Sequence, residues 1–254
     1  MTRSTLTAEA PSRTSTLDRP TLMALAITEY ERFAATLRSL TPDDWTKPTE
    51  CPGWDVRAMA GHCLGMAEMA ASIREQSRQQ KLALQRGGLY IDALTAVQVE
   101  KNADLTVPEL IARFEKIGPK AATGRRRAPG IIRSRTLPIV QHVGDQEERW
   151  TTGFLVDTIL TRDPWMHRFD IARAIGKPPE LSADHDGVIV ADVVDEWAGR
   201  HGEPVQLTLT GPAGGQWTYG IGGPSFEGDA VDFCRTLSGR APRATGLLTT
   251  QVPF

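Results

Sequence analysis

Two short stretches of the sequence carry residues that can bind a metal ion. The stretch CPGWDVRAMAGHCLG contains His62, and the stretch DPWMHRFDIARAIG contains Asp163, His167 and Asp170. In the second stretch the offsets are i, i+4 and i+7, which places the three side chains on one face of a helix. Catalytic zinc sites take three protein ligands from histidine and carboxylate and leave one position open. His62, His167 and one of the two aspartates would supply such a set.

Each of these residues also has an ordinary structural explanation. Asp163 precedes Pro164, and an aspartate followed by proline is typical of the cap and first turn of a helix. His62 could equally be a core histidine bonded to a backbone carbonyl. The spacing alone therefore leaves both the metal site and these structural roles open.

Length, composition and charge exclude several classes of function. A chain of 254 residues is more naturally two domains than one. Its 29 basic and 31 acidic residues give a net charge of −2, which argues against a nucleic-acid-binding protein with a basic face. No run of 18 apolar residues or secretory leader is found, and the three cysteines lack C-x-x-C spacing. These features predict a cytoplasmic protein that binds neither membrane nor nucleic acid.

The first two thirds of the chain predict a helical bundle that would position these residues. Residues 1–17 are rich in Ser, Thr and Arg and are expected to form a disordered tail. The second expected helix carries His62 on a stripe of apolar residues, so this side chain should point inward. A T-x-x-E capping box at Thr106 indicates a helix start within the third helical region. The expected helices cover residues 18–40, 55–73, 89–119 and 149–174, with a kink or end at Pro119 and a bend at Pro164.

The last third of the chain has a different pattern. A helix is expected from Ser182 through Trp197, followed by alternating strands over 205–210 and around Trp217. A further helix is expected over 231–237, and Leu247–Val252 could form a closing strand. The predicted fold class is therefore α+β, with a helical bundle over 18–178 and a smaller domain over 179–254 in which helices cover an antiparallel sheet.

Three stretches of the chain resemble a known family. DDWTKPTECPGWDVRAMAGHCLG is similar to the N-terminal signature of the mycothiol-dependent maleylpyruvate isomerase family, a branch of the DinB-like four-helix bundles. WMHRFDIARAIG is similar to the family's E-x-x-x-H-x-x-D stretch, and GDAVDFCRTLSGRAP resembles an element of its second, sterol-carrier-like domain. The likeness runs from about Leu17 to the end of the chain.

The resemblance implies a divalent metal, usually zinc, held by His62, Asp163 and His167. The family usually has glutamate where this chain has Asp163, which is one methylene shorter and precedes a proline. This departure leaves open whether Asp163 or Asp170 is the third ligand. We favour a role for Asp170 as the acceptor that holds the His167 ring. The resemblance also makes Arg240 the candidate for a catalytic charged group that reaches the cleft from the second domain.

The chemistry that the resemblance implies is nucleophilic attack by a low-molecular-weight thiol, mycothiol. Coordination to a dication deprotonates a thiol that is otherwise protonated at neutral pH. The thiolate would attack a small electrophile, which could carry carboxylates. The enzyme would then be a cis-trans isomerase if the electrophile is an enone, or an S-transferase if it is a halide or an epoxide. The alternatives are a non-catalytic carrier or stress-related binding protein for small ligands, and an enzyme whose metal activates water.

Several other reactive residues are assigned to ordinary roles. Cys63 adjoins His62 but lies about 100 degrees round the helix, so it is expected to pack in the core. The stretch GRRRAPGIIRSR, residues 124–135, is expected to be a basic loop, either simply solvated or a rim that collects carboxylate substrates. His185 is expected at the surface, and neither His142 nor His201 is assigned to the site.

Overall fold

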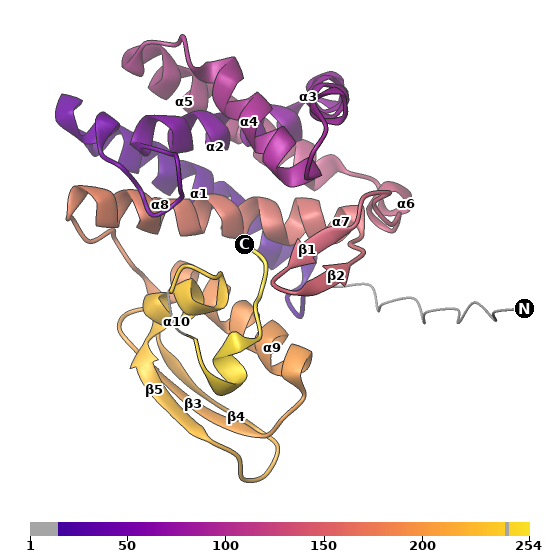
Figure 1. Ribbon diagram of the computed structural model, residues 1–254, viewed down its shortest axis with the longest axis vertical. Coiled ribbons are helices and arrows are strands. Elements are labelled where there is room, and N and C mark those ends of the chain that lie inside the picture. The colour runs from indigo at the N-terminus through magenta and orange to yellow at the C-terminus, as the bar shows by residue number, and fades with distance from the viewer. Residues whose placement is uncertain (1–14, 242–243) are drawn as a thin grey trace, which may run out of the picture.

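The computed structural model describes residues 15–241 and 244–254. Helices from the first two thirds of the chain form one layer, and a small sheet with its own helices packs below it (Figure 1). This arrangement is the α+β class that the sequence predicts. Most of the tail predicted over residues 1–17 lies outside the described residues.

The helical layer contains eight α-helices and one small hairpin among the described residues. The helix α8 runs along the base of this layer, where it faces the C-terminal part (Figure 1). The elements of the helical layer are α1 (Arg19–Ser39), a short helical turn at Pro42–Thr46, α2 (Val56–Ala71), α3 (Ile73–Arg86), α4 (Tyr90–Asn102), α5 (Val107–Arg127), α6 (Gly130–Arg133), β1 (Gln141–Val143), β2 (Gln146–Glu148), α7 (Thr152–Phe154), a π-helical turn (Leu155–Ile159) and α8 (Leu160–Ile175).

The C-terminal layer is a three-stranded sheet covered by two helices. Its strand order is β4-β3-β5, with β3 and β4 antiparallel and β3 and β5 parallel. The antiparallel pairing that the sequence predicts is found between β3 and β4, whereas the pairing of β3 with β5 is parallel. Its elements are a π-helical turn (Ala183–Gly187), α9 (Val188–His201), β3 (Val205–Thr210), β4 (Gly215–Tyr219), β5 (Ser225–Asp229), α10 (Ala230–Leu237) and a short turn at Gly246–Thr249.

Four local expectations differ from the structure. The helix α3 was not expected as a separate element, although the Ser72 side chain accepts from the Glu75 backbone at its start. Pro119 lies inside α5, which continues to Arg127, so the first part of the expected basic loop 124–135 is helical. The strand β5 was missed, and the expected closing strand over Leu247–Val252 is instead a short helical turn followed by extended chain.

Pro164 lies inside α8, and the irregular hydrogen bonding near it is found earlier, in the π-helical turn that leads into this helix. Proline has no N–H to donate to the carbonyl of the residue four positions earlier, which here is Leu160. The Arg125 guanidinium takes that place: its Nη1 donates to the Leu160 carbonyl at 3.0 Å, and its Nε donates to the Val156 carbonyl at 2.6 Å. Arg125 is only 2% exposed, so a buried cation from α5 satisfies the carbonyls that the turn and the proline leave free.

The helix α8 contributes to two hydrophobic cores. Its Ile171 packs with α1, α2 and α5 in the bundle, whereas Trp165 and Phe169 pack with α9, α10 and β3. The domain boundary expected at residue 178 stays a prediction, since α8 belongs to both cores. Among the described helices, none is both long and apolar enough to cross a lipid bilayer.

A buried ion-pair cluster joins α8 to α1 and to the turn before α9. Arg168 Nε lies 3.0 Å from Glu29 Oε1, and Arg168 Nη2 lies 2.7 Å from Asp186 Oδ1. His185 Nε2 lies 2.8 Å from Glu29 Oε2, so the expectation that His185 lies at the surface is wrong. All four side chains are buried.

We expect Arg168→Met to lower the free energy of unfolding by about 3–5 kcal/mol, because it removes the buried cation that Glu29 and Asp186 share, although Asp186 keeps its ion pair with Arg32. Arg38→Met is the matched control, since Arg38 and Glu115 form an ion pair whose side chains are 54% and 40% exposed. Its expected loss is about 0–1 kcal/mol. Urea denaturation measures both values. Equal losses in the two variants would contradict the role assigned to the buried cluster.

Candidate functional site

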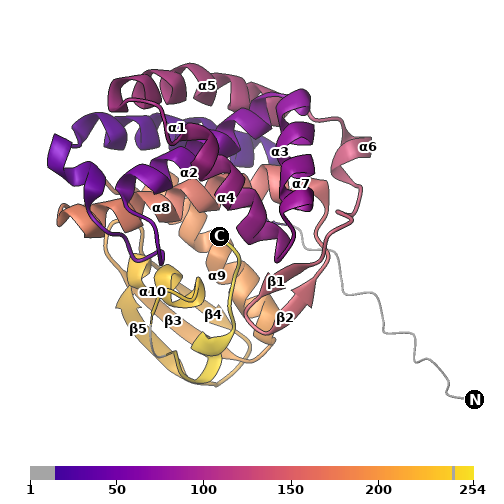
Figure 2. The ribbon, with the colours of Figure 1, turned by 45° about the horizontal axis from the view of Figure 1, so that its top comes forward.

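A cavity of about 1000 Å³ opens where the helical layer meets the C-terminal part. Its walls come from α2, α3, α4, α8, the segment that leads into β1, and the end of the chain. Figure 2 shows the C-terminus above the sheet and its helices, close to α8 and α4, and the last residues of the chain line the cavity together with residues of α4, α8 and β1. Elements that are distant in sequence therefore meet around one space.

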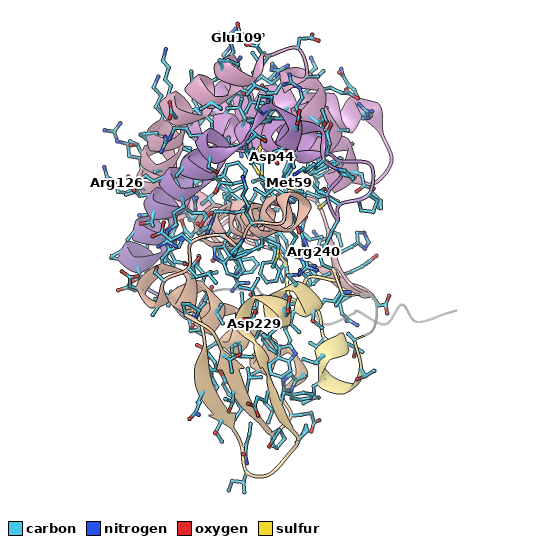
Figure 3. All side chains as sticks on the ribbon, turned by 90° about the vertical axis from the view of Figure 1, so that its left-hand side faces the viewer. Asp44, Met59, Glu109, Arg126, Asp229 and Arg240 are labelled. Atoms are coloured by element: carbon cyan, nitrogen blue, oxygen red, sulfur yellow. The ribbon has the colours of Figure 1, made fainter. Side chains whose placement is uncertain are left out.

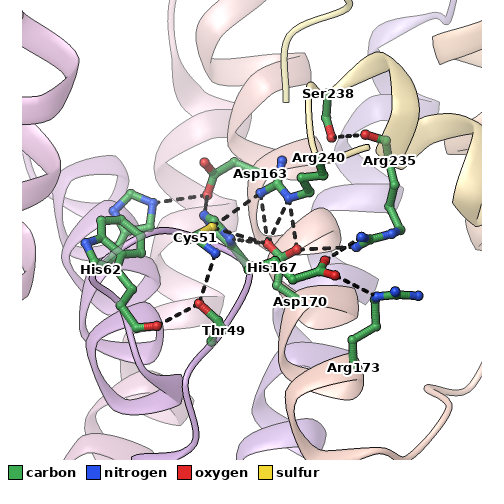
Figure 4. Close-up of polar contacts among 12 residues, drawn as sticks. Thr49, Cys51, His62, Asp163, His167, Asp170, Arg173, Arg235, Ser238 and Arg240 are labelled. Atoms are coloured by element: carbon green, nitrogen blue, oxygen red, sulfur yellow. Dashed lines mark hydrogen bonds and ion pairs between the residues drawn. The ribbon is translucent and has the colours of Figure 1, made fainter. Parts of the chain in front are cut away.

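His62, Asp163 and His167 lie together on one wall of this cavity. His62 comes from α2, and the other two come from successive turns of α8 (Figure 4). Asp163 Oδ2 lies 3.3 Å from His62 Nε2 and 3.6 Å from His167 Nε2. The two imidazole rings are perpendicular, with centroids 5.2 Å apart. One carboxylate oxygen is thus shared between the Nε2 atoms of two histidines.

The hydrogen bonds behind His62 fix which of its nitrogens carries the proton. The Gly65 carbonyl can only accept, so the Gln79 amide that contacts it at 3.0 Å must donate through Nε2. Gln79 Oε1 then accepts from Gln98 Nε2 at 3.0 Å, which leaves Gln98 Oε1 facing His62 Nδ1 at 2.8 Å. His62 Nδ1 must therefore carry a proton and donate it to Gln98 Oε1. When the ring is neutral, its other nitrogen, Nε2, has no proton and presents its lone pair to the cavity.

A close helix contact makes this arrangement possible. A Cβ atom added at Gly65 would lie only 2.6 Å from the Cβ of Gln98, so the glycine lets α4 approach α2 closely. Gly61 lies one turn earlier on the same face, where its carbonyl accepts from Asn102 Nδ2 at 2.9 Å. The pair of glycines therefore brings the amide of Gln98 within reach of His62.

Asp170 holds the ring of His167 from behind. Its Oδ2 lies 3.0 Å from His167 Nδ1, and Arg240 donates to the same carboxylate from Nε at 2.9 Å and from Nη2 at 2.8 Å. Asp170 has no exposed side-chain surface. Burial by itself raises the pKa of Asp170, but the bonds from His167 and Arg240 outweigh it and lower the pKa to about 2.

The carboxylates give the site a strong affinity for positive charge. Burial lowers the pKa of His167, but the charge of Asp163 and the bond to Asp170 outweigh it and raise the pKa to about 10. Burial also raises the pKa of Asp163, yet the neighbouring charges of His167 and His62 lower it overall. The carboxylates thus favour positive charge on or between the two imidazoles.

Two sets of side chains have ligand-type atoms close enough to share a metal ion. His62, Cys63 and Asp163 form one set, and Cys51, His167 and Asp170 form the other, each within 4.8 Å. Arg240 occupies the second set, because its guanidinium contacts both Asp170 and Cys51. The three ligands that the resemblance implies are divided between these two sets, and Asp163 Oδ2 is the atom that both Nε2 atoms face.

Cys63 lies closer to His62 and Asp163 than the helix geometry suggests, but its environment opposes ligation. The side chain is 2% exposed and packs in the bundle core. Burial, followed by the charge of Asp163, raises the pKa of the Cys63 thiol well above its ordinary value. A protonated, buried thiol is a packing group rather than a metal ligand.

The structure separates the arginine-rich stretch from this site. Arg125 is buried in the bundle, Arg133 pairs with Asp157, and the remaining arginines of residues 124–135 do not line the cavity. Figure 3 shows Arg126 projecting outward, whereas Arg240 lies between the helical and C-terminal parts. The expectation of an anion-collecting rim at residues 124–135 is therefore wrong. His142 lines the cavity, and His201 does not.

The sequence interpretation missed three residues at this site. Gln98 fixes His62, Trp54 packs against both imidazoles with centroids 5.0 and 5.9 Å away, and Cys51 contacts Asp170 and Arg240. Trp54 and Cys51 stand in the same CPGW stretch that drew attention to His62, so their position there was an available signal. Gln98 had none, since nothing local distinguishes it from other polar residues of α4.

Comparisons with known proteins agree on one family. Residues 27–172 match the family model described as mycothiol maleylpyruvate isomerase N-terminal domain. A crystal structure of the mycothiol-dependent maleylpyruvate isomerase is similar over 89% of this chain and 90% of that chain, with a TM-score of 0.56 and 15% identity. A histidine-to-alanine mutant of that enzyme gives a TM-score of 0.55 and 14% identity over the same shares. No curated protein sequence matches the chain.

We expect a double-mutant cycle to show that Arg240 and Asp170 stabilise the fold together. Arg240→Met and Asp170→Asn each remove one member of the buried pair, so each should destabilise the protein, while the double variant should lose less than the sum. The expected coupling is about 1–3 kcal/mol. The free energy of unfolding of the four proteins in urea measures it. Strictly additive losses would show that the two residues act independently.

Proposed function

The chain belongs to the family of the mycothiol maleylpyruvate isomerase N-terminal domain, and on this premise we propose that it is a metal-dependent enzyme with mycothiol as its nucleophile. Family membership confirms the expectation of an enzyme of the mycothiol-dependent isomerase type. The proposal adds a divalent cation, taken to be zinc, with His62, Asp163 and His167 as its ligands. It also adds a small electrophile as substrate, and a cytoplasmic location in keeping with three free cysteines.

One observation carries the metal proposal. The Nδ1 atoms of His62 and His167 face acceptors, at Gln98 and Asp170, while both Nε2 atoms face Asp163 Oδ2. Histidines that ligate metals commonly donate their second ring nitrogen to such an acceptor, which fixes the tautomer and the orientation of the ring. Two histidines and one carboxylate suit zinc and leave a position for another ligand.

A divalent cation bound there would supply Lewis acidity that keeps a thiol ionised at neutral pH. The chain's own residues would prepare the site for this chemistry. Gln98 and Asp170 hold the two rings in place, so that little reorganisation is required when a ligand enters. Trp54 packs over both rings and shields that side of the site from water.

Arg240 would bind and polarise the electrophile. Its Nε and Nη2 are engaged with Asp170, which leaves Nη1 without a hydrogen-bond partner among the described residues. The residue lines the cavity together with the histidines. A carbonyl oxygen of the substrate could accept from Nη1, and the charge of the guanidinium would stabilise the enolate that forms when a thiolate adds to an enone.

We favour a cis-trans isomerase, in accordance with the family, over an S-transferase. In the isomerase the thiolate adds to one alkene carbon, the electron pair moves to the carbonyl oxygen, and the resulting single bond rotates. Return of the electron pair re-forms the alkene and expels the thiolate, so the thiol is unchanged. In the transferase a halide or an epoxide oxygen would leave with the electron pair, and the sulfur would stay on the product.

We expect the purified protein to hold one zinc ion per chain and to lose it in His62→Ala, His167→Ala and Asp163→Asn, because each substitution removes a ligand. Gln98→Leu removes no ligand but takes away the acceptor behind His62 and the donor to Gln79, and should weaken zinc binding by about 10–100-fold. Elemental analysis after dialysis, with competition by a chelator, measures both effects. His201→Ala is the matched control and should keep its zinc.

Two results would contradict the metal proposal. One is wild-type protein without metal after dialysis against zinc, and the other is stoichiometric zinc in both histidine variants while they remain folded. Metal-free protein that copurifies with an apolar ligand would instead favour the non-catalytic carrier.

We expect isomerisation of a cis-enone by the zinc-loaded protein to require mycothiol, because the proposed nucleophile is the thiol. The measurement is the ultraviolet change on cis-trans conversion, corrected for the reaction with mycothiol alone. Arg240→Met with zinc retained should reduce kcat by about 10²-fold or more, since it removes the group that stabilises the enolate. Turnover of a substrate without any thiol would instead indicate a metal-activated water.

A further inference from the structure

Part of the lining of the cavity that contains the histidines is apolar. This part, called here the apolar arm, includes Met66 and Met69 of α2, Leu94 of α4, Ile139 and Trp150. Methionine side chains adapt to ligands of different shape, and aromatic rings offer large apolar contact surfaces. The volume of about 1000 Å³ is at the upper end of small-molecule sites, which leaves room for a thiol and a second compound together.

Three further apolar residues line the cavity where it is open to solvent. They are Leu84, Leu89 and Ile91, which are 65%, 57% and 52% exposed. A cluster of exposed large hydrophobic residues is uncommon on a protein surface away from a binding site. Here the cluster is continuous with the cavity that contains His62 and His167, which points to a ligand that enters from this side with an apolar surface.

Positive charge is scarce in the cavity. Among the described residues that line it, Arg240 is the one lysine or arginine, while Asp92 and Asp163 are acidic. The Arg240 charge is already balanced by Asp170, which accepts from two of its nitrogens. In the proposed loaded site, the two charges of the cation would be matched by Asp163 and the thiolate. Arg240 Nη1 can bind one oxygen, so a substrate with two carboxylates would leave one of them without a cationic partner in a low-dielectric space.

From these observations we infer that the enzyme acts on an uncharged, apolar electrophile, namely a neutral α,β-unsaturated ketone with a bulky hydrocarbon or aryl group, and not on a dicarboxylate. This inference rests on the proposed function, since it assigns the substrate of the same site. The carbonyl oxygen lies toward Arg240 Nη1, and the apolar group packs against the apolar arm. Addition and loss of the thiolate follow the balanced isomerisation described above, with no net oxidation.

Binding tests the inference separately from catalysis. We expect trans-1,2-dibenzoylethylene, a neutral aryl enedione, to bind the purified protein at least about tenfold more tightly than fumarate, with both measured by calorimetry without thiol. Turnover is then measured with zinc and mycothiol on cis-1,2-dibenzoylethylene and on maleylpyruvate. We expect kcat/KM to favour the neutral compound by at least about tenfold.

A charge introduced into the arm should reverse part of this preference. In Ile139→Arg a guanidinium joins the apolar wall, so the preference in kcat/KM for the neutral compound should fall by about tenfold. Ile132→Arg is the matched control, because Ile132 is 39% exposed, lies in the same part of the chain and does not line the cavity. It should leave the preference unchanged. Thermal denaturation checks that both variants are folded.

The outcomes separate the two proposals. Tighter binding of fumarate, binding of neither compound, or faster turnover of maleylpyruvate would overturn the apolar substrate while leaving a thiol-dependent isomerase intact. Preferential binding of the neutral compound without thiol-dependent turnover would overturn the proposed function and support the apolar specificity of the cavity.

Discussion

The candidate site depends on the buried charge of Asp170. A carboxylate without solvent contact is strongly unfavourable unless its oxygens accept hydrogen bonds from charged or polar donors. The closest donors are His167, one turn earlier on α8, and Arg240, which follows α10 in the C-terminal part, and Cys51 and Arg235 lie 3.7 Å from the same carboxylate. The Asp170 carboxylate therefore both orients His167 and holds the C-terminal part against the bundle. The site is complete only when both layers are in place.

The helix α8 links these layers because it carries polar groups on more than one face. Asp163 and His167 line the cavity, and Asp170 lies behind the His167 ring, whereas Arg162 pairs with Asp192 of α9 at 2.6 Å. Arg168 pairs with Glu29 and with the turn before α9. Each buried charge is matched by a partner on a different element, so these contacts specify how the elements meet. The histidines are consequently held on helix interiors, where their positions are more precise than on loops.

Local periodicity explains what the sequence could predict. The spacing of Asp163, His167 and Asp170 fixes a common helix face, and the apolar stripe around His62 predicts that it points inward. The π-helical turn before α8 could not be predicted in this way, because it depends on Arg125 from a different helix. The strand β5 has the sequence SFEGD, whose charged and glycine residues lack strand alternation, and its pairing with β3 supplies the regularity that its own residues do not.

The cavity provides two kinds of interaction, and this difference connects structure with reactivity. On the wall formed by α2 and α8, a chain of hydrogen bonds from the Gly65 carbonyl through two glutamines fixes which nitrogen of His62 acts as the acceptor. The apolar part of the lining includes Met66 and Met69 of α2 and, from other segments, Ile139 and Trp150. The imidazoles and the segment before β1 therefore belong to separate elements. A change in the segment before β1 can alter which electrophile binds while leaving the imidazoles, and the charge that they attract, undisturbed.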